Sequence, residues 1–323
     1  MKSKFVGLVA DVGGTNARFA LVDDAGHIRF PRSFLCRDYD SLAAIIAEYL
    51  ATAAGRQHPS RAAIAVAGPV VDGEIEFTNL DWRVSEVDLL AAFELEAVSL
   101  INDFAAQALA APRLDAENLR AIGPKLRGAD YSPIVVLGAG SGFGVAGMAR
   151  SERGDLAIAT EGGHAGFAPY DDLETEVWKR LRLKHARVSI ERLLSGPGLY
   201  ELYRALGDIE GTHADLNDEK AVLEASVAGD RLADAAVERF CAIFGSVAGD
   251  FALAYGARGG VFISGGIAPR MVDRLMAGGF RARFEDKGRL SDFVREIPTQ
   301  LIVHPYPALV GAARQLAQME SLR

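Results

Sequence analysis

A pattern of strand, glycine turn and strand occurs twice in this chain, and it constrains the fold more than any other feature. Residues 5–10 form an apolar run that predicts a buried strand, and the glycine-rich residues 11–15 follow it. Strand character then resumes at residues 18–22. Residues 134–137 lead in the same way into a second glycine turn at residues 138–142. We therefore expect two copies of one strand-turn-strand unit.

The two turns align residue by residue. Asp11, Gly13 and Thr15 of the first turn fall opposite Gly138, Gly140 and Gly142 of the second. This repeat indicates an ancient internal duplication with one phosphate-binding loop in each half. Glycine also follows buried strands in many α/β proteins, so a chance match stays open at this point.

Helical patterns and further short strands complete an α/β fold. The apolar residues of 42–50 and 240–251 recur at helical spacing and predict helices that cover the sheets. Residues 260–264 predict another strand, which ends at a third glycine turn, Gly265-Gly266, before a helix that begins near Pro269. Short buried strands alternating with helices are typical of α/β proteins.

The chain length favours two lobes. With 323 residues, the chain is about twice the usual length of one domain. A last helix follows Pro307, and in a duplicated fold it is expected to return to the first lobe. We therefore expect a small α/β lobe of residues 1–108 plus 308–323 and a large α/β lobe of residues 109–307.

Charge and cysteine content exclude several classes of protein. A net charge of −8 argues against a surface that collects nucleic acid or anionic lipid, because such binding needs clustered Lys and Arg. Cys36 and Cys241 lie outside any CxxC spacing, which predicts neither a disulfide framework nor a zinc site and fits a reducing compartment. The first apolar run stops at Asp11, too short for a signal peptide or a membrane span. We expect a cytoplasmic protein that binds neither nucleic acid nor membrane.

The first glycine turn suits phosphate and Mg²⁺. Its glycines let the main chain approach phosphate oxygens, and the Asp11 carboxylate is a candidate ligand for hydrated Mg²⁺. A double glycine after a strand is more often only a tight turn, but three such turns in one chain favour phosphate binding. The GxxxxGKS/T and GxGxxG patterns are absent, so neither a P-loop nucleoside triphosphatase nor a nicotinamide enzyme is supported.

Asn102-Asp103 follows the strand of residues 98–101 and precedes the helical residues 104–110. Sheets of α/β proteins place ligand-binding residues at this position. The Asp103 carboxylate is suited to take the proton of a sugar hydroxyl as that hydroxyl attacks phosphorus, while Asn102 offers a donor and an acceptor. The alternative, an Asn-Asp cap of the following helix, stays open at this point.

Glu161-Gly162-Gly163-His164 places an acceptor and an imidazole on a loop whose glycines prevent a regular helix. This pair is typical of a clamp on sugar hydroxyls, whereas a metal site lacks a third ligand nearby. Glu191 lies in a short helical stretch, residues 188–194, and by itself resembles a surface residue. Asn79 and Trp82 are interpreted as a turn residue and a packed side chain.

Several motifs in a fixed order together resemble the bacterial glucokinase family, within the hexokinase, Hsp70 and actin superfamily. The resemblance runs nearly from end to end. Its motifs are DVGGTNAR (11–18), AGP (67–69), LINDF (100–104), GAGSGFG (138–144), EGGH (161–164), RLLSGPG (192–198) and GGVFISGGIAPR (259–270).

The resemblance implies a duplicated ribonuclease-H-like fold of the actin-like ATPase type, with two lobes around a central cleft. The family's catalytic base falls on Asp103, and its glucose ligands fall on Asn102, Asp103, Glu161, His164 and Glu191. Its ATP-binding residues fall on Ala10, Asp11, Val12, Gly13, Gly14, Thr15, Gly140, Ser141, Gly142, Gly265 and Gly266.

The resemblance also implies the reaction and its cofactors. MgATP would phosphorylate the 6-hydroxyl of glucose, giving glucose 6-phosphate and ADP, the first step of glycolysis. A related repressor and sugar kinase group carries a cysteine-rich zinc motif, but this chain has no cysteine between Cys36 and Cys241, so no zinc is expected. Family likeness suggests a homodimer. A kinase for a related hexose or amino sugar, a non-catalytic sugar-sensing regulator and an ATPase that works through partners remain the alternatives.

Overall fold

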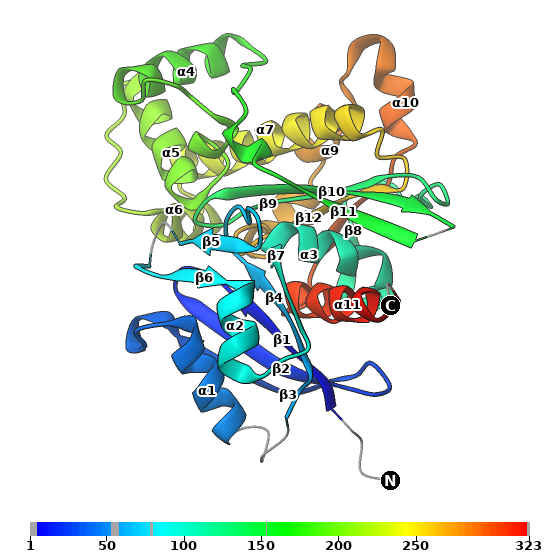
Figure 1. Cartoon of the computed structure of the whole chain (residues 1–323). Helices are drawn as coiled ribbons and strands as arrows, with labels where there is room; N and C mark the ends of the chain where they lie inside the picture. Colours follow the sequence, from blue (N-terminus) through cyan, green and yellow to red (C-terminus); the bar gives the residue numbers. More distant parts are fainter. Residues whose placement is uncertain (1–4, 53–57, 78–79, 153, 322–323) are drawn as a thin grey trace. The chain divides into compact units, whose positions relative to one another are not determined.

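Two compact units make up the structure. This computed structural model describes residues 5–52, 58–77, 80–152 and 154–321 (Figure 1). The first unit comprises residues 1–114, 155–159 and 304–323, and the second comprises residues 115–154 and 160–303. Within the described residues, no helix is long and apolar enough to cross a membrane.

The first unit is built on a sheet in the order β3-β2-β1-β4-β7. β1 pairs antiparallel with β2 and parallel with β4, which pairs parallel with β7. The strands are β1 (Phe5–Val12), β2 (Asn16–Asp23), β3 (Ile28–Leu35), β4 (Arg61–Val66) and β7 (Ala97–Asn102), with a separate ribbon of β5 (Glu74–Glu76) and β6 (Arg83–Ser85). The helices are α1 (Leu42–Thr52), α2 (Glu86–Phe93), α3 (Asp103–Ala110) and α11 (Pro307–Ser321).

Helices cover both faces of this sheet at its central strands. Alternate residues of β1 face opposite ways, so Leu8 joins the core under α1 and α2 while Val9 joins the core under α11. Figure 1 shows α1 and α2 on one side of the sheet and α3 and α11 on the other. Trp82 is buried and packs edge to face on Phe77 with ring centroids 6.1 Å apart, as expected, while Asn79 lies outside the described residues.

The second unit contains a sheet with the strand order β10-β9-β12-β13-β8. Its strands are β8 (Leu119–Ala121), β9 (Ile134–Ala139), β10 (Phe143–Ser151), β12 (Gly260–Ser264) and β13 (Thr299–Ile302). Its helices are α4 (Asp172–Lys184), α5 (Gly196–Glu210), α6 (Glu219–Val227), α7 (Arg231–Tyr255), α8 (Val272–Met276), α9 (Gly279–Glu285) and α10 (Ser291–Arg295). The long α7, yellow in Figure 1, packs against β9 and β12.

The strand β11 (Gly154–Thr160) is divided between the units, because residues 155–159 are grouped with the first. Asp155 explains the grouping. Its carboxylate accepts a hydrogen bond from Arg113 at 2.6 Å, and its carbonyl accepts one from the Gln318 amide at 2.9 Å. These contacts hold the start of β11 to α11 and to the turn after α3.

The strand run β10-β9-β12-β13 repeats the run β2-β1-β4-β7, each being an antiparallel hairpin followed by two parallel strands. The predicted duplication is therefore confirmed. Residues 13–16 connect the paired Val12 and Ala17, whereas residues 140–142 connect the paired Ala139 and Phe143. Since the second connection is one residue shorter, the predicted alignment holds as far as Val12 and Ala139 and is offset by one residue from Ala17 and Phe143 onward.

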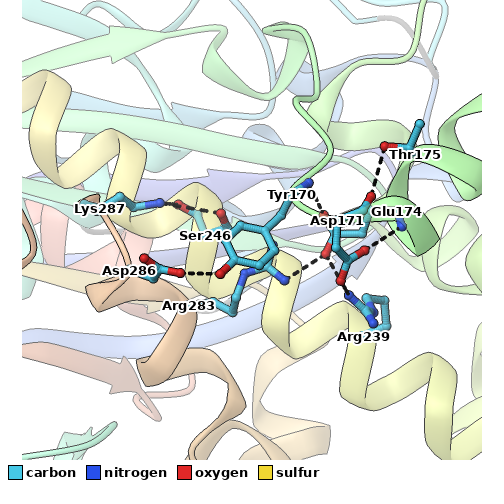
Figure 2. Close-up of polar contacts among 9 residues, drawn as sticks. All are labelled: Tyr170, Asp171, Glu174, Thr175, Arg239, Ser246, Arg283, Asp286 and Lys287. Carbon is cyan, nitrogen blue, oxygen red and sulfur yellow. Dashed lines mark hydrogen bonds and ion pairs between the residues drawn. The ribbon is translucent and has the colours of Figure 1, made fainter.

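A cluster of buried charges ties α4 to α7 and α9 in the second unit (Figure 2). Glu174, only 1% exposed, accepts hydrogen bonds from Arg239 at 3.1 Å, from Arg283 at 2.9 Å and from the backbone N–H of Tyr170 at 2.9 Å. Arg283 also stacks 3.6 Å from the centroid of the Tyr170 ring. Asp171 caps α4 and accepts from Arg239 at 2.5 Å. Burial alone would raise the pKa of Asp171, but the Glu174 N–H and the Arg239 guanidinium together outweigh it and lower that pKa.

Replacing Glu174 should destabilise the second unit. Glu174→Gln removes the buried negative charge that the partly buried Arg239 and Arg283 share, which costs about 3 kcal/mol of unfolding free energy. Urea unfolding of the variant and the parent chain measures this difference. Glu176→Gln is the matched control on the same helix, because Glu176 is 41% exposed and pairs with Lys179 and Arg180 at the surface. Its loss should change the unfolding free energy by less than about 1 kcal/mol. Equal effects of the two changes would contradict this account.

Candidate active site

The first glycine turn is held in shape by Cys36. The backbone N–H of Gly13 donates to the Asn16 carbonyl at 2.9 Å, which closes the turn. Cys36 then donates twice from outside, its N–H to the Thr15 carbonyl at 2.9 Å and its thiol to the Gly13 carbonyl at 3.4 Å. Burial raises the pKa of this thiol, so Cys36 acts here as a structural brace. No local sequence signal pointed to Cys36.

Asp11 lies beside this turn and faces Arg18. The Arg18 guanidinium donates to Oδ2 of Asp11 at 3.3 Å and also lies 5.8 Å from the centroid of the Tyr306 ring. Burial raises the pKa of Asp11, and the positive charge of Arg18 opposes this rise. The Asp11 carboxylate is removed from water, and Arg18 balances its negative charge only in part. It is therefore suited to bind a cation that comes closer than Arg18 does. Ala10 and Val12 on either side are buried, and Thr15 is exposed at the tip of the turn.

Asn102 caps α3. Its Oδ1 accepts from the backbone N–H groups of Phe104 at 3.0 Å and Ala105 at 3.1 Å, and its Nδ2 donates to the Gly68 carbonyl at 3.2 Å. Asp103 is the first residue of the helix, partly exposed, and its Oδ1 accepts from the same Phe104 N–H at 2.9 Å. The cap anticipated for this pair is therefore provided by Asn102.

The register of the sheet brings these segments to one edge. Val12 at the end of β1 pairs with Val66 of β4, and Val66 pairs with Asn102 of β7. The Ala67 N–H extends this contact by donating to the Val12 carbonyl at 3.0 Å. The first glycine turn and Asn102-Asp103 thus leave two parallel strands, β1 and β7, at their carboxyl ends on either side of β4, the edge where α/β sheets bind ligands.

The second and third glycine turns meet backbone to backbone. Gly138 pairs with Ser264, and a Cβ at Gly138 would lie 2.2 Å from the Ser264 carbonyl oxygen. Gly265 has a φ of +87°, and a Cβ there would lie 2.3 Å from the Ala139 carbonyl oxygen. Only glycine fits this crossing. The crossing brings the predicted ATP residues Gly140, Ser141 and Gly142 close to Gly265 and Gly266.

The EGGH loop packs on the start of β10. Glu161 and His164 are exposed, whereas Gly163 is buried. The Cα of Gly163 lies so close to β10 that a Cβ on it would be 2.0 Å from the Phe143 carbonyl oxygen. His164 N–H donates to the Glu161 carbonyl at 3.0 Å, and the His164 carbonyl accepts from Arg187 at 2.8 Å. The loop therefore presents its two polar side chains outward from a backbone fixed by packing.

Glu191 belongs to the same region of the second unit. It lies in a 3₁₀ helix, Ile190–Arg192, so the longer helical stretch expected over residues 188–194 was wrong in type and extent. The Ile190 N–H donates to the Ala165 carbonyl at 2.9 Å, which joins this helix to the EGGH loop. One oxygen of the Glu191 carboxylate accepts from the Phe143 N–H at 2.9 Å. The structure thus joins Glu191 to the second glycine turn. The sequence did not predict this contact, because Glu191 and Phe143 are 48 positions apart.

The repeated sheet with glycine turns at the carboxyl ends of its strands is that of the actin-like ATPase fold, and the comparisons with known proteins define the class as ATP-dependent sugar kinases. A family model described as Glucokinase matches residues 8–319. The chain therefore belongs to the glucokinase family.

Individual relatives agree with this assignment. A curated glucokinase of Caulobacter sp. (strain K31) is 53% identical over 311 residues, 95% of this chain and 94% of the relative. A glucokinase crystal structure from an Antarctic psychrotroph is 39% identical, with a TM-score of 0.87 and coverage of 97% of this chain and 98% of that chain. The ROK family glucokinase of Streptomyces griseus, in complex with glucose and AMPPNP, is 19% identical with a TM-score of 0.66 over 97% and 99% of the two chains, a likeness of fold alone.

Adding a methyl group to Gly163 should disrupt the EGGH loop. Gly163→Ala places Cβ against the Phe143 carbonyl, so backbone must move, at a cost of about 1 to 3 kcal/mol in unfolding free energy. Thermal unfolding measures the loss. Gly166→Ala is the matched control three residues on, because its Cβ would meet only Arg187 at 3.8 Å. A Gly163→Ala variant as stable as Gly166→Ala would contradict the close packing of this loop.

Proposed function

We propose that this chain is a glucokinase that transfers the γ-phosphate of ATP to the 6-hydroxyl of glucose, giving glucose 6-phosphate and ADP. The main support from the structure is the row Val12, Val66 and Asn102, which brings a glycine turn and Asp103 to one ligand-binding edge of the first unit. Family membership over residues 8–319 supports the same reaction. The two units correspond in this proposal to the small and large lobes predicted from the sequence.

In this proposal Asp103 is the general base. It takes the proton of the 6-hydroxyl as the hydroxyl oxygen attacks the γ-phosphorus. Capping of α3 by Asn102 supports the assignment, because the helix start does not depend on Asp103 as its cap. Nδ2 of Asn102 carries two hydrogens and donates one to the Gly68 carbonyl, so one donor remains for a sugar hydroxyl.

Glu161, His164 and Glu191 are the proposed glucose ligands of the second unit. Glu161 and His164 are exposed on a loop with a fixed backbone, and Glu191 lies in the 3₁₀ helix bonded to that loop. Carboxylates accept strongly from sugar hydroxyls, and imidazole can donate or accept. Together they supply the mixture of partners that a polyol needs.

The glycine turns are the proposed ATP site. Residues 10–15 and 140–142 would lie against the phosphates, with the Gly13 and Gly140 N–H groups closing their own turns, and Gly265-Gly266 would face the adenosine. The Asp11 carboxylate fits a hydrated Mg²⁺, because it is desolvated, acidic and only partly compensated by Arg18. When bound, Mg²⁺ neutralises charge on the phosphate oxygens during transfer. Zinc has no place in this proposal, and no group of three or more metal-binding side chains occurs in the part of the chain that the structure describes.

The proposed setting is the cytoplasm, at the first step of glycolysis. Cys36 and Cys241 are both free and buried, which agrees with a reducing compartment. Family likeness also suggests a homodimer, which light scattering coupled to gel filtration would measure.

A coupled assay of ADP release tests the proposed function. Glucose should stimulate ADP release from MgATP, while mannose, fructose and glucosamine should stimulate it less. Faster phosphorylation of another hexose would instead assign a related sugar kinase. ADP release without dependence on any sugar, or no ADP release at all, would overturn the proposal.

Asp103→Asn should lower kcat by roughly 10²- to 10⁴-fold, the usual contribution of a positioned base, while glucose binding persists. Steady-state kinetics and isothermal titration with glucose measure the two effects. Asp88→Asn is the matched control, because Asp88 is an exposed acidic residue in the first turn of α2 in the same unit. Full activity of Asp103→Asn would remove Asp103 from the reaction.

Glu161→Gln should raise the KM for glucose more than it lowers kcat. The change replaces a charged acceptor by a neutral one and weakens its hydrogen bond to the sugar, by roughly tenfold in KM. Glu296→Gln, at an exposed carboxylate of the same unit, is the control and should leave KM unchanged. An unchanged glucose KM in Glu161→Gln would argue against the clamp.

A further inference from the structure

Glu191 packs directly on the second glycine turn. Its Oε2 accepts a hydrogen bond at 2.9 Å from the N–H of Phe143, the residue that follows Gly142. A Cβ on Gly142 would lie 2.5 Å from the same carboxylate oxygen, so glycine leaves the space that the carboxylate occupies. A side chain proposed to bind glucose is therefore in contact with the turn proposed to bind phosphate.

The backbone around Glu191 is tied to the other end of the same turn. The N–H of Gly196 donates to the Gly140 carbonyl at 2.8 Å. Ser195, the N-cap of α5, donates its hydroxyl to the Glu191 carbonyl at 2.8 Å. Both ends of the turn are thus bonded to the segment that carries Glu191, and the carboxylate is held beside the turn in a fixed position.

This position sets two anions beside each other when ATP binds. The phosphates at residues 140–142 would meet the negative charge of Glu191, and like charges close together repel each other most strongly where water is scarce. A glucose hydroxyl that donates to Glu191 would counteract the repulsion, because a hydrogen bond to a carboxylate draws part of its charge toward the donor.

We propose that Glu191 is a positioning residue that couples the two substrates: its charge weakens ATP binding at the second glycine turn until glucose donates a hydrogen bond to it. The inference rests on the proposed function, since it takes glucose as the donor. The coupling would favour glucose binding before productive ATP binding, and it would limit transfer of phosphate to water when no sugar is present.

Three variants separate the charge of Glu191 from its hydrogen bond. In Glu191→Gln the side-chain oxygen can still accept from Phe143, but the charge is gone. Glu191→Asp keeps the charge and is too short to preserve the same contact. Glu224→Gln removes a charge at a residue that is 69% exposed on α6 and serves as the matched control.

The dissociation constant of Mg-AMPPNP is measured by titration calorimetry with and without saturating glucose. In the parent chain and in Glu224→Gln, glucose should tighten AMPPNP binding. In Glu191→Gln, AMPPNP should bind roughly tenfold more tightly than in the parent chain when glucose is absent, the effect of one like charge near the site. In this variant, the gain in AMPPNP affinity that glucose produces should shrink by a similar factor. Thermodynamic linkage requires the gain in glucose affinity that AMPPNP produces to shrink by the same factor. Glu191→Asp should show no gain in AMPPNP affinity without glucose.

A merely structural role for Glu191 predicts a different result, namely equal or weaker AMPPNP binding in Glu191→Gln. That result, or a gain from glucose as large as in the parent chain, overturns the inference. Glucose phosphorylation by the parent chain is measured alongside. Suppose that the parent chain forms glucose 6-phosphate, and that glucose tightens AMPPNP binding as much in Glu191→Gln as in the parent chain. The inference then fails and the proposed function stands. If the parent chain forms none, both fail.

Discussion

Parallel pairing at the carboxyl ends of the strands is the constraint on which the rest of the structure depends. In the first unit, the row Val12, Val66 and Asn102 fixes where a glycine turn and the start of α3 leave the sheet. In the second unit, the pairing of Gly138 with Ser264 does the same for two further glycine turns. Because side chains alternate along a strand, a shift of one residue would turn the buried face of each strand outward. The register therefore fixes the core and the candidate site together.

The candidate site is made of small backbone features that contacts with neighbouring residues hold in place. Cys36 holds the first turn through its N–H and thiol, and Asn102 holds the start of α3. In the second unit, Gly163 lets the EGGH loop touch β10. Binding residues positioned in this way lose little freedom when a ligand arrives, which is the physical basis of preorganisation. The charges around the buried Glu174 serve a different purpose, since they join α4 to α7 and α9.

The pair Asn102-Asp103 shows why motif and role can be separated only in three dimensions. A helix cap and a catalytic base both follow a strand and precede a helix, so the local pattern favours each equally. The structure shows that Asn102 caps the helix, because its Oδ1 accepts from two backbone N–H groups and its Nδ2 donates to the Gly68 carbonyl. Gly68 precedes the pair by more than thirty positions, so the spacing of residues along the chain could not predict this hydrogen bond.

The sequence by itself determined the α/β class, the duplicated strand and turn units, and the motifs of the glucokinase family, because these depend on residues close together in the chain. It also placed β12 at residues 260–264 with both ends correct, since an apolar run closed by glycine marks a buried strand. Only the tertiary structure decided the contact of Glu191 with Phe143, the brace of Cys36 and the buried pairing of Glu174 with Arg239 and Arg283. Each of these contacts joins segments far apart in sequence, and it exists only because packing of the sheets and helices brings those segments together.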